Sequence, residues 1–440
     1  MRPFLNNKGF IKYFNNTSWL FAEKILRMMI SLFIGIWIAR YLGPSDFGLF
    51  SYVQSFVGLF IVFSTLGLDS IIIKELVKNE AKCNELIGTA FYLKLIGSII
   101  IIIIISFIIP FISTDNYTNI LIYIISLSII FQSFNVVDFY FQSKILSKYV
   151  VYINTISLFI SSSIKIILIL NEASLISFTY VILFDSIILA FGFIYIYIKE
   201  NPLINIKSLH FDKKLAISLL KDSWPLILSG FVISIYMKID QVMIKEILTV
   251  KEVGEYAVAA RISELWYFFP MILVSSLFPA IINAKKNNDA LYYSRLQKLY
   301  NLMLWSSIII AIIITFLSET IILFLFGNVF INASDVLVIH IWTGIFIFFN
   351  IACSKWVIIE NLQKYAIYLD ISAVGINIIL NIIFIPIWGI KGAAFATLLS
   401  YSTSIFLVYS IIPQFRIVIK MFLKSLVLPL DIIYNLIKRT

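Results

Sequence analysis

The chain has 440 residues, of which 61% are hydrophobic and 13% are charged, and its mean hydropathy is +0.98. Soluble domains have about 45–50% apolar and about 25% charged residues, so this composition excludes a water-soluble fold. The formal net charge is +10, but the basic residues are spread over short connecting segments, which argues against a nucleic-acid partner.

Apolar stretches that are long enough to cross a membrane follow one another along the chain, because a spanning helix needs roughly 20 mostly apolar residues. A polar, basic break at 199–221 separates six such stretches from six more. The predicted spans are 18–39, 47–68, 87–112, 120–137, 149–170, 175–198, 224–244, 256–283, 300–326, 336–359, 366–388 and 392–413. Only helices and closed barrels satisfy the backbone in hydrocarbon, and these stretches lack the alternation of barrel strands. We therefore predict an all-α integral membrane protein with about 12 transmembrane helices.

The basic residues between the spans predict the orientation in the membrane. When the connecting segments and the two ends are counted alternately, one set contains 23 Lys and Arg residues and the other contains 4. Short cytoplasmic loops are enriched in positive charge, so the first set is predicted to be cytoplasmic. Both termini then lie in the cytoplasm, which requires an even number of spans.

The two halves of the chain resemble each other weakly. The dipeptide SW occurs at 18–19 and again at 223–224, and DFGLF at 46–50 has a counterpart, EVGEY, at 252–256. An even number of spans per copy predicts two six-helix bundles in the same orientation, related by a pseudo-twofold axis along the membrane normal. The predicted parts are an N-terminal lobe at 1–200, a cytoplasmic basic linker at 201–222, a C-terminal lobe at 223–413 and a cytoplasmic basic amphipathic tail at 414–440.

Charged side chains inside the predicted spans are the candidate functional residues, since a charge at mid-bilayer costs at least about 2.5–3.5 kcal/mol. One interpretation is structural pairing, because the spacings of Glu23 with Arg27 and of Arg261 with Glu264 place each pair on one helix face. The other is a cationic cavity between the lobes that receives an anionic head group. The candidates for that cavity are Lys24, Arg27, Lys94, Lys238 and Arg261, and the candidate acidic partners or ion carriers are Asp240 and Glu264.

The sequence does not indicate an enzyme or a metal centre. It contains no HExxH, no GxSxG and no phosphate-binding glycine loop, so we predict no catalytic residues and no organic cofactor. Cys83 and Cys353 lack a spacing that would suggest a disulfide framework or a metal site. The glycines of WGIKGAA at 388–394 fall between two spans, where they predict a tight turn with close helix packing.

Several motifs carry a resemblance to a known family. They are NTSWLFAEK at 16–24, ARYLGPSDFG at 39–48 and TLGLD at 65–69 in the first half, and KIDQVMI at 238–244, VGEYAVAARISE at 253–264 and WGIKGAA at 388–394 in the second. Together they resemble the Wzx-type O-antigen flippases of the multidrug/oligosaccharidyl-lipid/polysaccharide (MOP) superfamily. The resemblance implies export of an undecaprenyl-diphosphate-linked O-antigen or similar repeat unit from the cytoplasmic to the periplasmic leaflet of the bacterial inner membrane.

The resemblance also implies site residues and partners. Segments of the related lipid II flippases that carry a functional Arg, Asp and Arg are similar to those around Arg40, Asp46 and Arg261, although Arg40 and Asp46 could equally cap a tight outer turn. The superfamily implies a coupling ion, a proton or Na⁺, for which Asp240 and Glu264 are the candidate carriers. The implied partners are the lipid-linked oligosaccharide, membrane lipid and other membrane proteins of polysaccharide assembly.

Two other functions are compatible with a chain of this composition. A multidrug or organic-cation exporter of the same superfamily would need an acidic and aromatic cavity without an excess of Lys and Arg. A membrane polysaccharide polymerase would normally need a sizeable hydrophilic outer loop, and the predicted outer loops here are short. We therefore expect a flippase that works by alternating access through the cationic cavity.

Overall fold

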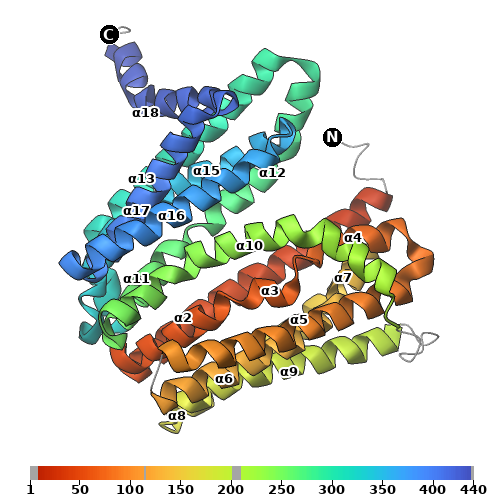
Figure 1. Ribbon diagram of the computed structural model, residues 1–440. Coiled ribbons are helices and arrows are strands. Elements are labelled where there is room, and N and C mark those ends of the chain that lie inside the picture. The colour runs from red at the N-terminus through yellow and green to blue at the C-terminus, as the bar shows by residue number, and fades with distance from the viewer. Residues whose placement is uncertain (1–7, 113–114, 201–209, 438–440) are drawn as a thin grey trace. The chain divides into compact units, whose positions relative to one another are not determined.

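The structure is a computed structural model that describes residues 8–112, 115–200 and 210–437, and all regular structure in these ranges is helical (Figure 1). The chain divides into two compact units. Unit 1 comprises Met1–Leu42 and Leu49–Lys238, and unit 2 comprises Gly43–Gly48 and Ile239–Thr440. The predicted all-α fold is confirmed.

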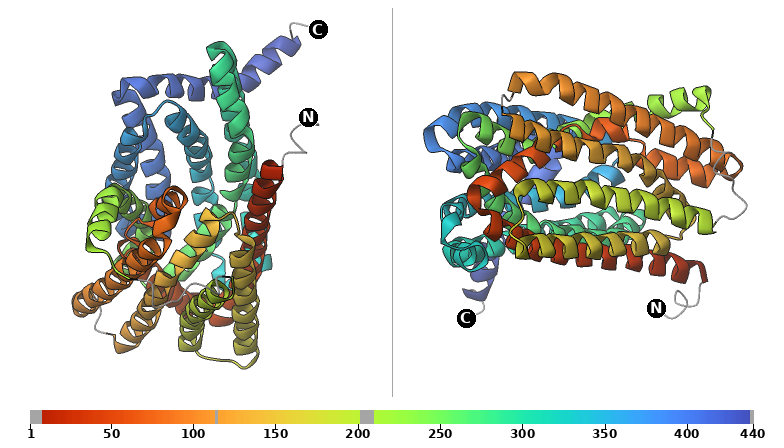
Figure 2. Two further views of the ribbon diagram at one scale, coloured as in Figure 1. Left: turned by 90° about the vertical axis from the view of Figure 1, so that its right-hand side faces the viewer. Right: turned by 90° about the horizontal axis from the view of Figure 1, so that it is seen from below.

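Unit 1 is built from the helices of the first half of the chain. These are α2 (Lys8–Gly58), α3 (Ile61–Thr65), α4 (Asp69–Lys78), α5 (Cys83–Ile112), α6 (Asn116–Phe131), α7 (Val136–Ser143), α8 (Lys148–Leu170), α9 (Leu175–Glu200) and most of α10 (Lys213–Ile247). Helix α9 packs beside α6 and α8, and α3 packs against α5 (Figures 1 and 2). One apolar core, which includes Ile72, Phe141 and Leu219, joins α4, α7 and α10.

Unit 2 contains the remaining helices. They are α11 (Val250–Leu265), α12 (Phe268–Asn287), α13 (Asp289–Phe326), α14 (Ala333–His340), α15 (Thr343–Ile359), α16 (Gln363–Trp388), α17 (Ile390–Ile411) and α18 (Arg416–Ile437). Helices α16 and α17 form a closely packed hairpin, and α13 packs against α12, α14 and α15. The core of this unit is rich in aromatic side chains, among them Tyr300, Phe348, Phe349 and Trp356.

Within the described residues, eleven helical segments are long and apolar enough to cross a membrane. The first, Asn16–Lys78, has 63 residues. At 1.5 Å per residue it would be about 95 Å long, whereas the hydrocarbon core is about 30 Å thick. This segment contains the first two predicted spans and is interrupted at Gly43, where φ is 70°. The prediction of about 12 spans therefore agrees with the structure, while the cytoplasmic location of the termini stays a prediction.

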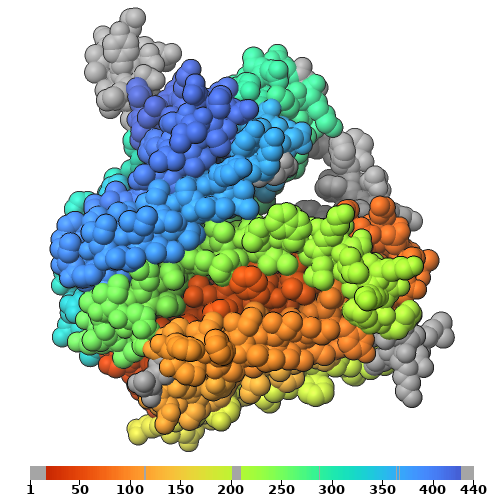
Figure 3. Space-filling view, in the orientation of Figure 1, coloured from red at the N-terminus to blue at the C-terminus, as the bar shows by residue number. Residues whose placement is uncertain are grey.

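The long sides of many helices carry exposed apolar side chains, as a membrane requires. Phe107 and Phe111 on α5 are 71% and 78% exposed, and Phe316 and Phe324 on α13 are 83% and 78% exposed. Figure 3 shows the open side of α5. In water such surfaces would be unfavourable, so we assign them to contact with lipid.

Four of the predicted spans are interrupted by short breaks. In the second predicted span, 47–68, the breaks lie between α2 and α3 and between α3 and α4. In the fourth, 120–137, a 3₁₀ turn, Gln132–Asn135, separates α6 from α7. In the eighth predicted span, 256–283, Trp266 and Tyr267 separate α11 from α12. In the tenth, 336–359, residues 341–342 separate α14 from α15. These are the second and fourth spans of each half, so the breaks recur with the predicted internal repeat.

The predicted basic linker is partly helical. Helix α10 begins at Lys213, because the Asp212 carboxylate accepts a hydrogen bond from the backbone N–H of Leu215 at 2.7 Å and caps the helix. This bond lowers the pKa of the Asp212 carboxyl. Residues 213–222 of the predicted linker therefore belong to a helix, and residues 201–209 lie outside the described residues. The limits of the predicted lobes stay predictions.

Candidate functional site

Asp240 is the centre of a buried polar cluster in unit 2. Its side chain is on α10 and is only 7% exposed. The Tyr256 hydroxyl donates to Oδ2 at 2.6 Å, the Asn381 amide donates to Oδ1 at 2.6 Å, and the Thr397 hydroxyl lies 2.6 Å from Oδ2. The amide of Asn381 also donates to Asn377 Oδ1 at 3.0 Å. The cluster is therefore a network in which every group close to the carboxylate is neutral.

The α16–α17 hairpin brings three of these side chains together. Asn377 and Asn381 are four residues apart on α16 and share one helix face. The turn at Gly389, where φ is 58°, reverses the chain into α17, which carries Thr397. A Cβ added to Gly392 would lie 2.2 Å from the carbonyl oxygen of Phe384, so only glycine permits this approach. The predicted tight turn with close helix packing is confirmed.

Neutral side chains surround the carboxylate of Asp240. Within the described part of the chain it forms no ion pair, and its hydrogen-bonding neighbours are the neutral side chains of Tyr256, Asn381 and Thr397. Among the residues that the structure describes, the buried Oδ1 of Asn381 has no hydrogen-bond partner, and the Ala393 carbonyl lies 3.0 Å from the Thr397 hydroxyl. A buried charge with only neutral partners is costly, so this centre is suited to take up a proton or a small cation.

His340 lies beside this cluster at the end of α14. Its ring is fully enclosed and meets the Tyr256 ring edge to face, with centroids 5.9 Å apart and an interplanar angle of 85°. Among the described residues, its Nδ1 atom has no hydrogen-bond partner. Histidine thus adds a second titratable group next to the tyrosine that holds Asp240.

Unit 1 contains a different kind of polar contact near the start of the chain. Glu23 is buried, and its Oε1 accepts a hydrogen bond at 2.7 Å from Nε of Arg27, four residues along α2. The guanidinium also donates to the carbonyl oxygen of Asn154 on α8 at 3.2 Å. The pairing of Glu23 with Arg27 that their spacing predicts is confirmed, and it ties α2 to α8.

Lys94 forms another ion pair of unit 1. Its side chain is 1% exposed, and Nζ lies 3.0 Å from Oδ1 of Asp69 and 4.6 Å from the ring centroid of Phe139. Asp69 begins α4, so the pair joins α4 to α5. The sequence predicted Lys94 as a cavity residue because its own helix offers no acid nearby. In the structure the acid comes from another helix, which favours a structural role.

Arg261 lies on α11 against the first repeated motif. Its guanidinium carbon is 5.6 Å from the ring centroid of Phe47, and Glu264 interacts with it electrostatically. A Cβ on Gly48 would lie 1.7 Å from the carbonyl oxygen of Val250, and a Cβ on Gly254 would lie 2.1 Å from that of Pro44. Gly48 and Gly254, the glycines of the two copies of the repeated motif, therefore allow the backbones of the two copies to touch within unit 2.

The other predicted site residues differ in exposure. Lys24, Arg40 and Asp46 are exposed, and Arg40 and Asp46 flank the interruption of α2 at Gly43. Lys238 is half-buried, with its aliphatic stem against Gly58 at 3.7–3.9 Å. Glu264 is half-buried. Their roles in binding or coupling stay predictions.

Sequence reasoning missed most partners of Asp240. Tyr256, Asn377, Asn381 and Thr397 are neutral, and a search for intramembrane charges passes over them. The available signal was the pair of asparagines four residues apart in an apolar span, because a polar amide in a membrane needs a partner.

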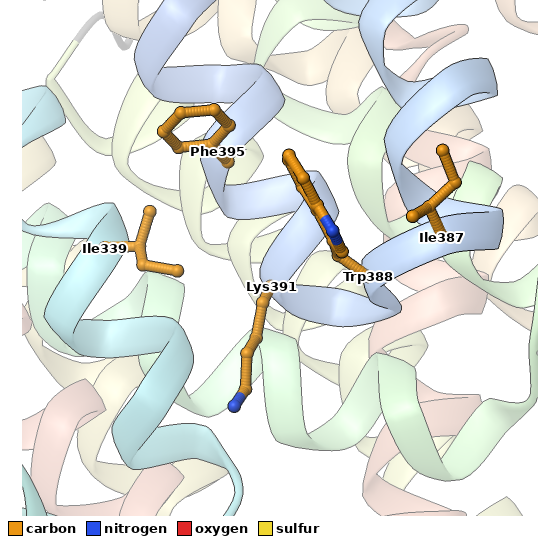
Figure 4. A pocket seen from close by; sticks show the side chains of 5 residues that line it. All are labelled: Ile339, Ile387, Trp388, Lys391 and Phe395. Atoms are coloured by element: carbon orange, nitrogen blue, oxygen red, sulfur yellow. The ribbon is translucent and has the colours of Figure 1, made fainter.

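A small cavity of about 530 Å³ lies at one end of unit 2. Its lining residues are Ile339, Ile387, Trp388, Lys391 and Phe395. Figure 4 shows the Trp388 ring between Phe395 and Ile387, with the Lys391 amine pointing away from the rings. That amine lies 2.7 Å from Oδ2 of Asp335, so its charge is already paired. The cavity is mainly apolar, and its lining does not include the side chains that contact Asp240.

Comparison with known protein families gives two matches. The family model described as Polysaccharide biosynthesis protein matches residues 13–285, more than half of the chain. The MatE model matches residues 225–383. The first match includes Asp240, Tyr256 and Arg261, and the second also includes Asn377 and Asn381.

Curated relatives and solved structures extend this comparison. The chain is 28% identical over 174 residues to the "Probable low-salt glycan biosynthesis flippase Agl15" of Haloferax volcanii, and the aligned part is 38% of this chain and 36% of that protein. It is also similar to an inward-facing multidrug resistance MATE family transporter of the MOP superfamily, with a TM-score of 0.72, 14% identity and coverage of 94% of this chain and 96% of that one.

A third similar protein is the lipid II flippase MurJ in an inward closed conformation. The TM-score is 0.69 and the identity is 19%, with coverage of 94% of this chain and 92% of that chain. At these identities the likeness establishes the fold alone, which the chain shares with these two proteins.

Proposed function

Because the chain belongs to the polysaccharide biosynthesis protein family, we propose that it is a flippase that moves a lipid-linked oligosaccharide across the membrane. The family match over residues 13–285 carries this proposal, and the aligned glycan flippase of Haloferax volcanii supports it. Alternating access, in which the substrate site opens first to one side and then to the other, is the expected mechanism. Polysaccharide-assembly proteins of the same membrane are the expected partners.

The proposed substrate is an undecaprenyl-diphosphate-linked O-antigen or a similar repeat unit, carried to the periplasmic leaflet of a bacterial inner membrane. Support comes from two basic side chains in the spans, Lys238 and Arg261. Within the described residues neither Lys238 nor Arg261 forms an ion pair at or under 4.0 Å, unlike Arg27 and Lys94. Arginine suits a diphosphate because its planar guanidinium can make two parallel hydrogen bonds. Arg261 is therefore the preferred head-group residue.

The membrane potential would help such a transfer. With the cytoplasm negative, each negative charge that moves outward gains about 2.3 kcal/mol per 100 mV. A diphosphate would gain roughly twice that amount, and the positively charged empty site would be drawn back towards the cytoplasm. This energetic argument supports export and not import of the substrate.

A coupling ion, a proton or Na⁺, is proposed to bind at Asp240. The oxygens of Asp240, Asn377, Asn381, Thr397 and Ala393 are hard ligands of the type that small cations prefer, and the unpaired Oδ1 of Asn381 fits such a role. A bound cation would neutralise the buried carboxylate. Because the cluster joins α10, α11, α16 and α17, its occupancy would favour one packing of these helices over another.

A multidrug or organic-cation exporter is the second candidate. The MatE match over residues 225–383 and the similar MATE transporter favour it. The positive charges of Lys238 and Arg261 count against a cationic substrate. The two functions predict different phenotypes, so one genetic experiment separates them.

The test deletes the gene in the organism that carries it and restores it as the intact chain, Arg261→Ala, Arg261→Lys or the control Lys286→Gln, an exposed residue at the end of α12. Surface polysaccharide and lipid-linked oligosaccharide on the cytoplasmic leaflet are measured at matched membrane expression. If the chain is a flippase, deletion should abolish surface polysaccharide and cause lipid-linked oligosaccharide to accumulate on the cytoplasmic leaflet. The intact chain and Lys286→Gln should reverse both effects, and Arg261→Ala should not. Unchanged polysaccharide with new sensitivity to organic cations would favour the exporter instead.

A further inference from the structure

One face of helix α18 packs against the rest of unit 2. Val418, Met421, Phe422 and Ser425 are buried. Gln297 on α13 donates through Nε2 to the carbonyl oxygen of Met421 and to Oγ of Ser425, both at 2.9 Å. The indole N–H of Trp305 donates to the carbonyl oxygen of Ser425 at 2.9 Å. The part of α18 from 416 to 427 is therefore docked on α13 by specific hydrogen bonds.

The opposite side of the same segment is both apolar and basic. Leu423, Leu426 and Val427 are 48%, 42% and 45% exposed. Lys420 and Lys424 are exposed and four residues apart, so they form one column along the helix. The column of Leu423 and Val427 adjoins it on the helix surface. Residues 416–427 contain three basic residues and no acidic one.

The place of α18 in the fold fits a membrane surface. The last apolar span, α17, ends at Ile411, and only the short turn Pro413–Phe415 comes before α18. Figures 1 and 2 show the first part of α18 running across α13, which extends beyond it, close to the end of α17. A helix that starts directly after a span and runs sideways next to the end of that span lies at the level of the lipid head groups. Its exposed leucines can then contact acyl chains while the lysines reach the head groups.

We propose that the exposed face of residues 416–427 binds the anionic head groups of membrane phospholipids. The charge of the face selects an acidic surface, and the adjoining apolar column selects a lipid surface over a soluble acidic protein. Each Lys or Arg near an anionic leaflet strengthens binding by about fivefold. Since α18 is hydrogen-bonded to Gln297 and Trp305, lipid binding is transmitted to α13. This interaction does not rest on the proposed flippase function.

The test compares the full chain in nanodiscs of phosphatidylcholine alone and of phosphatidylcholine and phosphatidylglycerol in equal parts. Hydrogen exchange of the 416–427 amides is measured in both for the intact chain, for Lys420→Gln/Lys424→Gln, and for Lys286→Gln/Lys364→Gln. The last variant removes two exposed basic residues of the same unit and is the matched control.

We expect exchange in this segment to be slower by about tenfold or more in the anionic nanodiscs for the intact chain and the control. The Lys420/Lys424 variant should lose this difference, and Lys420→Arg/Lys424→Arg should keep it. The charge-preserving variant shows whether any loss reflects misfolding. Equal exchange in both lipids, or an equal loss in the control, would overturn the proposal.

Discussion

The two units bury polar groups in different ways. In unit 1, the buried Glu23 is paired with Arg27 and the buried Lys94 is paired with Asp69, so both of these charges meet their opposite. In unit 2, Asp240 meets only neutral donors from three other helices. A paired charge holds helices in place, whereas an acid without a base can accept a cation from outside. The comparison separates a structural use of charge in unit 1 from a candidate coupling centre in unit 2.

The largest expected loss of stability comes from breaking the ion pair between Lys94 and Asp69. Asp69→Asn would leave a buried ammonium group without its carboxylate and should lower the free energy of unfolding by about 3–5 kcal/mol. Lys94→Met removes the buried charge itself and leaves Asp69, which is 56% exposed. It should be close to neutral, because apolar replacement of a buried charge is often tolerated. Unfolding of the purified chain in mixed micelles measures both, and equal losses would contradict this account of the pair.

The test at Asp240 is a gain in stability that appears only when a cation is present. If a cation binds the folded chain alone, the intact protein should gain about 2.7 kcal/mol at a concentration 100-fold above the dissociation constant. Asp240→Asn should abolish this gain while the protein stays folded. Unfolding in Na⁺ and in choline, each at several pH values, tells whether the ion is Na⁺ or a proton. A cation-dependent gain that persists in Asp240→Asn would exclude this centre.

The close backbone contact of the repeated motifs gives a third test. Gly48→Ala places a Cβ against the Val250 carbonyl and should cost about 1–3 kcal/mol of unfolding free energy by overpacking. Gly375→Ala on α16 is the control, because an added Cβ there meets no atom within 4 Å. It should raise helix stability by up to about 1 kcal/mol. Opposite signs for the two substitutions support the contact, and a neutral Gly48→Ala would refute it.

The smallest effect is expected at the Glu23–Arg27 pair. The Arg27 side chain is 36% exposed, and solvent screens such pairs, so Glu23→Gln should cost about 1 kcal/mol or less. Arg27→Gln also removes the bond to the Asn154 carbonyl and should cost more than Glu23→Gln. The same mixed-micelle unfolding assay compares them. A loss for Glu23→Gln as large as that of Asp69→Asn would remove the distinction between the exposed and the buried pair.

Much of the fold follows from the sequence because hydrocarbon leaves a chain few options. Apolar length predicts the spans, and the i, i+4 spacing predicts the Glu23–Arg27 pair. The breaks in the second and fourth spans of each half were not predicted, since Trp266 and Tyr267, for example, are neither proline nor glycine. The break at Trp266 and Tyr267 therefore follows from packing, whereas Gly67, with a φ of 58°, lies in the break between α3 and α4.

The site is less accessible to sequence reasoning than the fold. Asp240 could be identified because an acid in an apolar span is conspicuous. Its partner Thr397 is 157 residues away in the sequence, and Asp69 lies on a different helix from Lys94. Such contacts depend on which helices pack together, and spacing within one helix cannot reveal them.

The most direct test of the flippase proposal uses proteoliposomes that contain the purified chain and lipid-linked oligosaccharide extracted from the organism that carries the gene. The fraction of substrate that a membrane-impermeant sugar-modifying reagent can reach is followed over time. A flippase predicts that this fraction rises from the outer-leaflet share towards the whole pool, and that Arg261→Ala slows the rise while Lys286→Gln does not. A fraction that stays at the outer-leaflet share with the intact, folded chain would contradict the proposal.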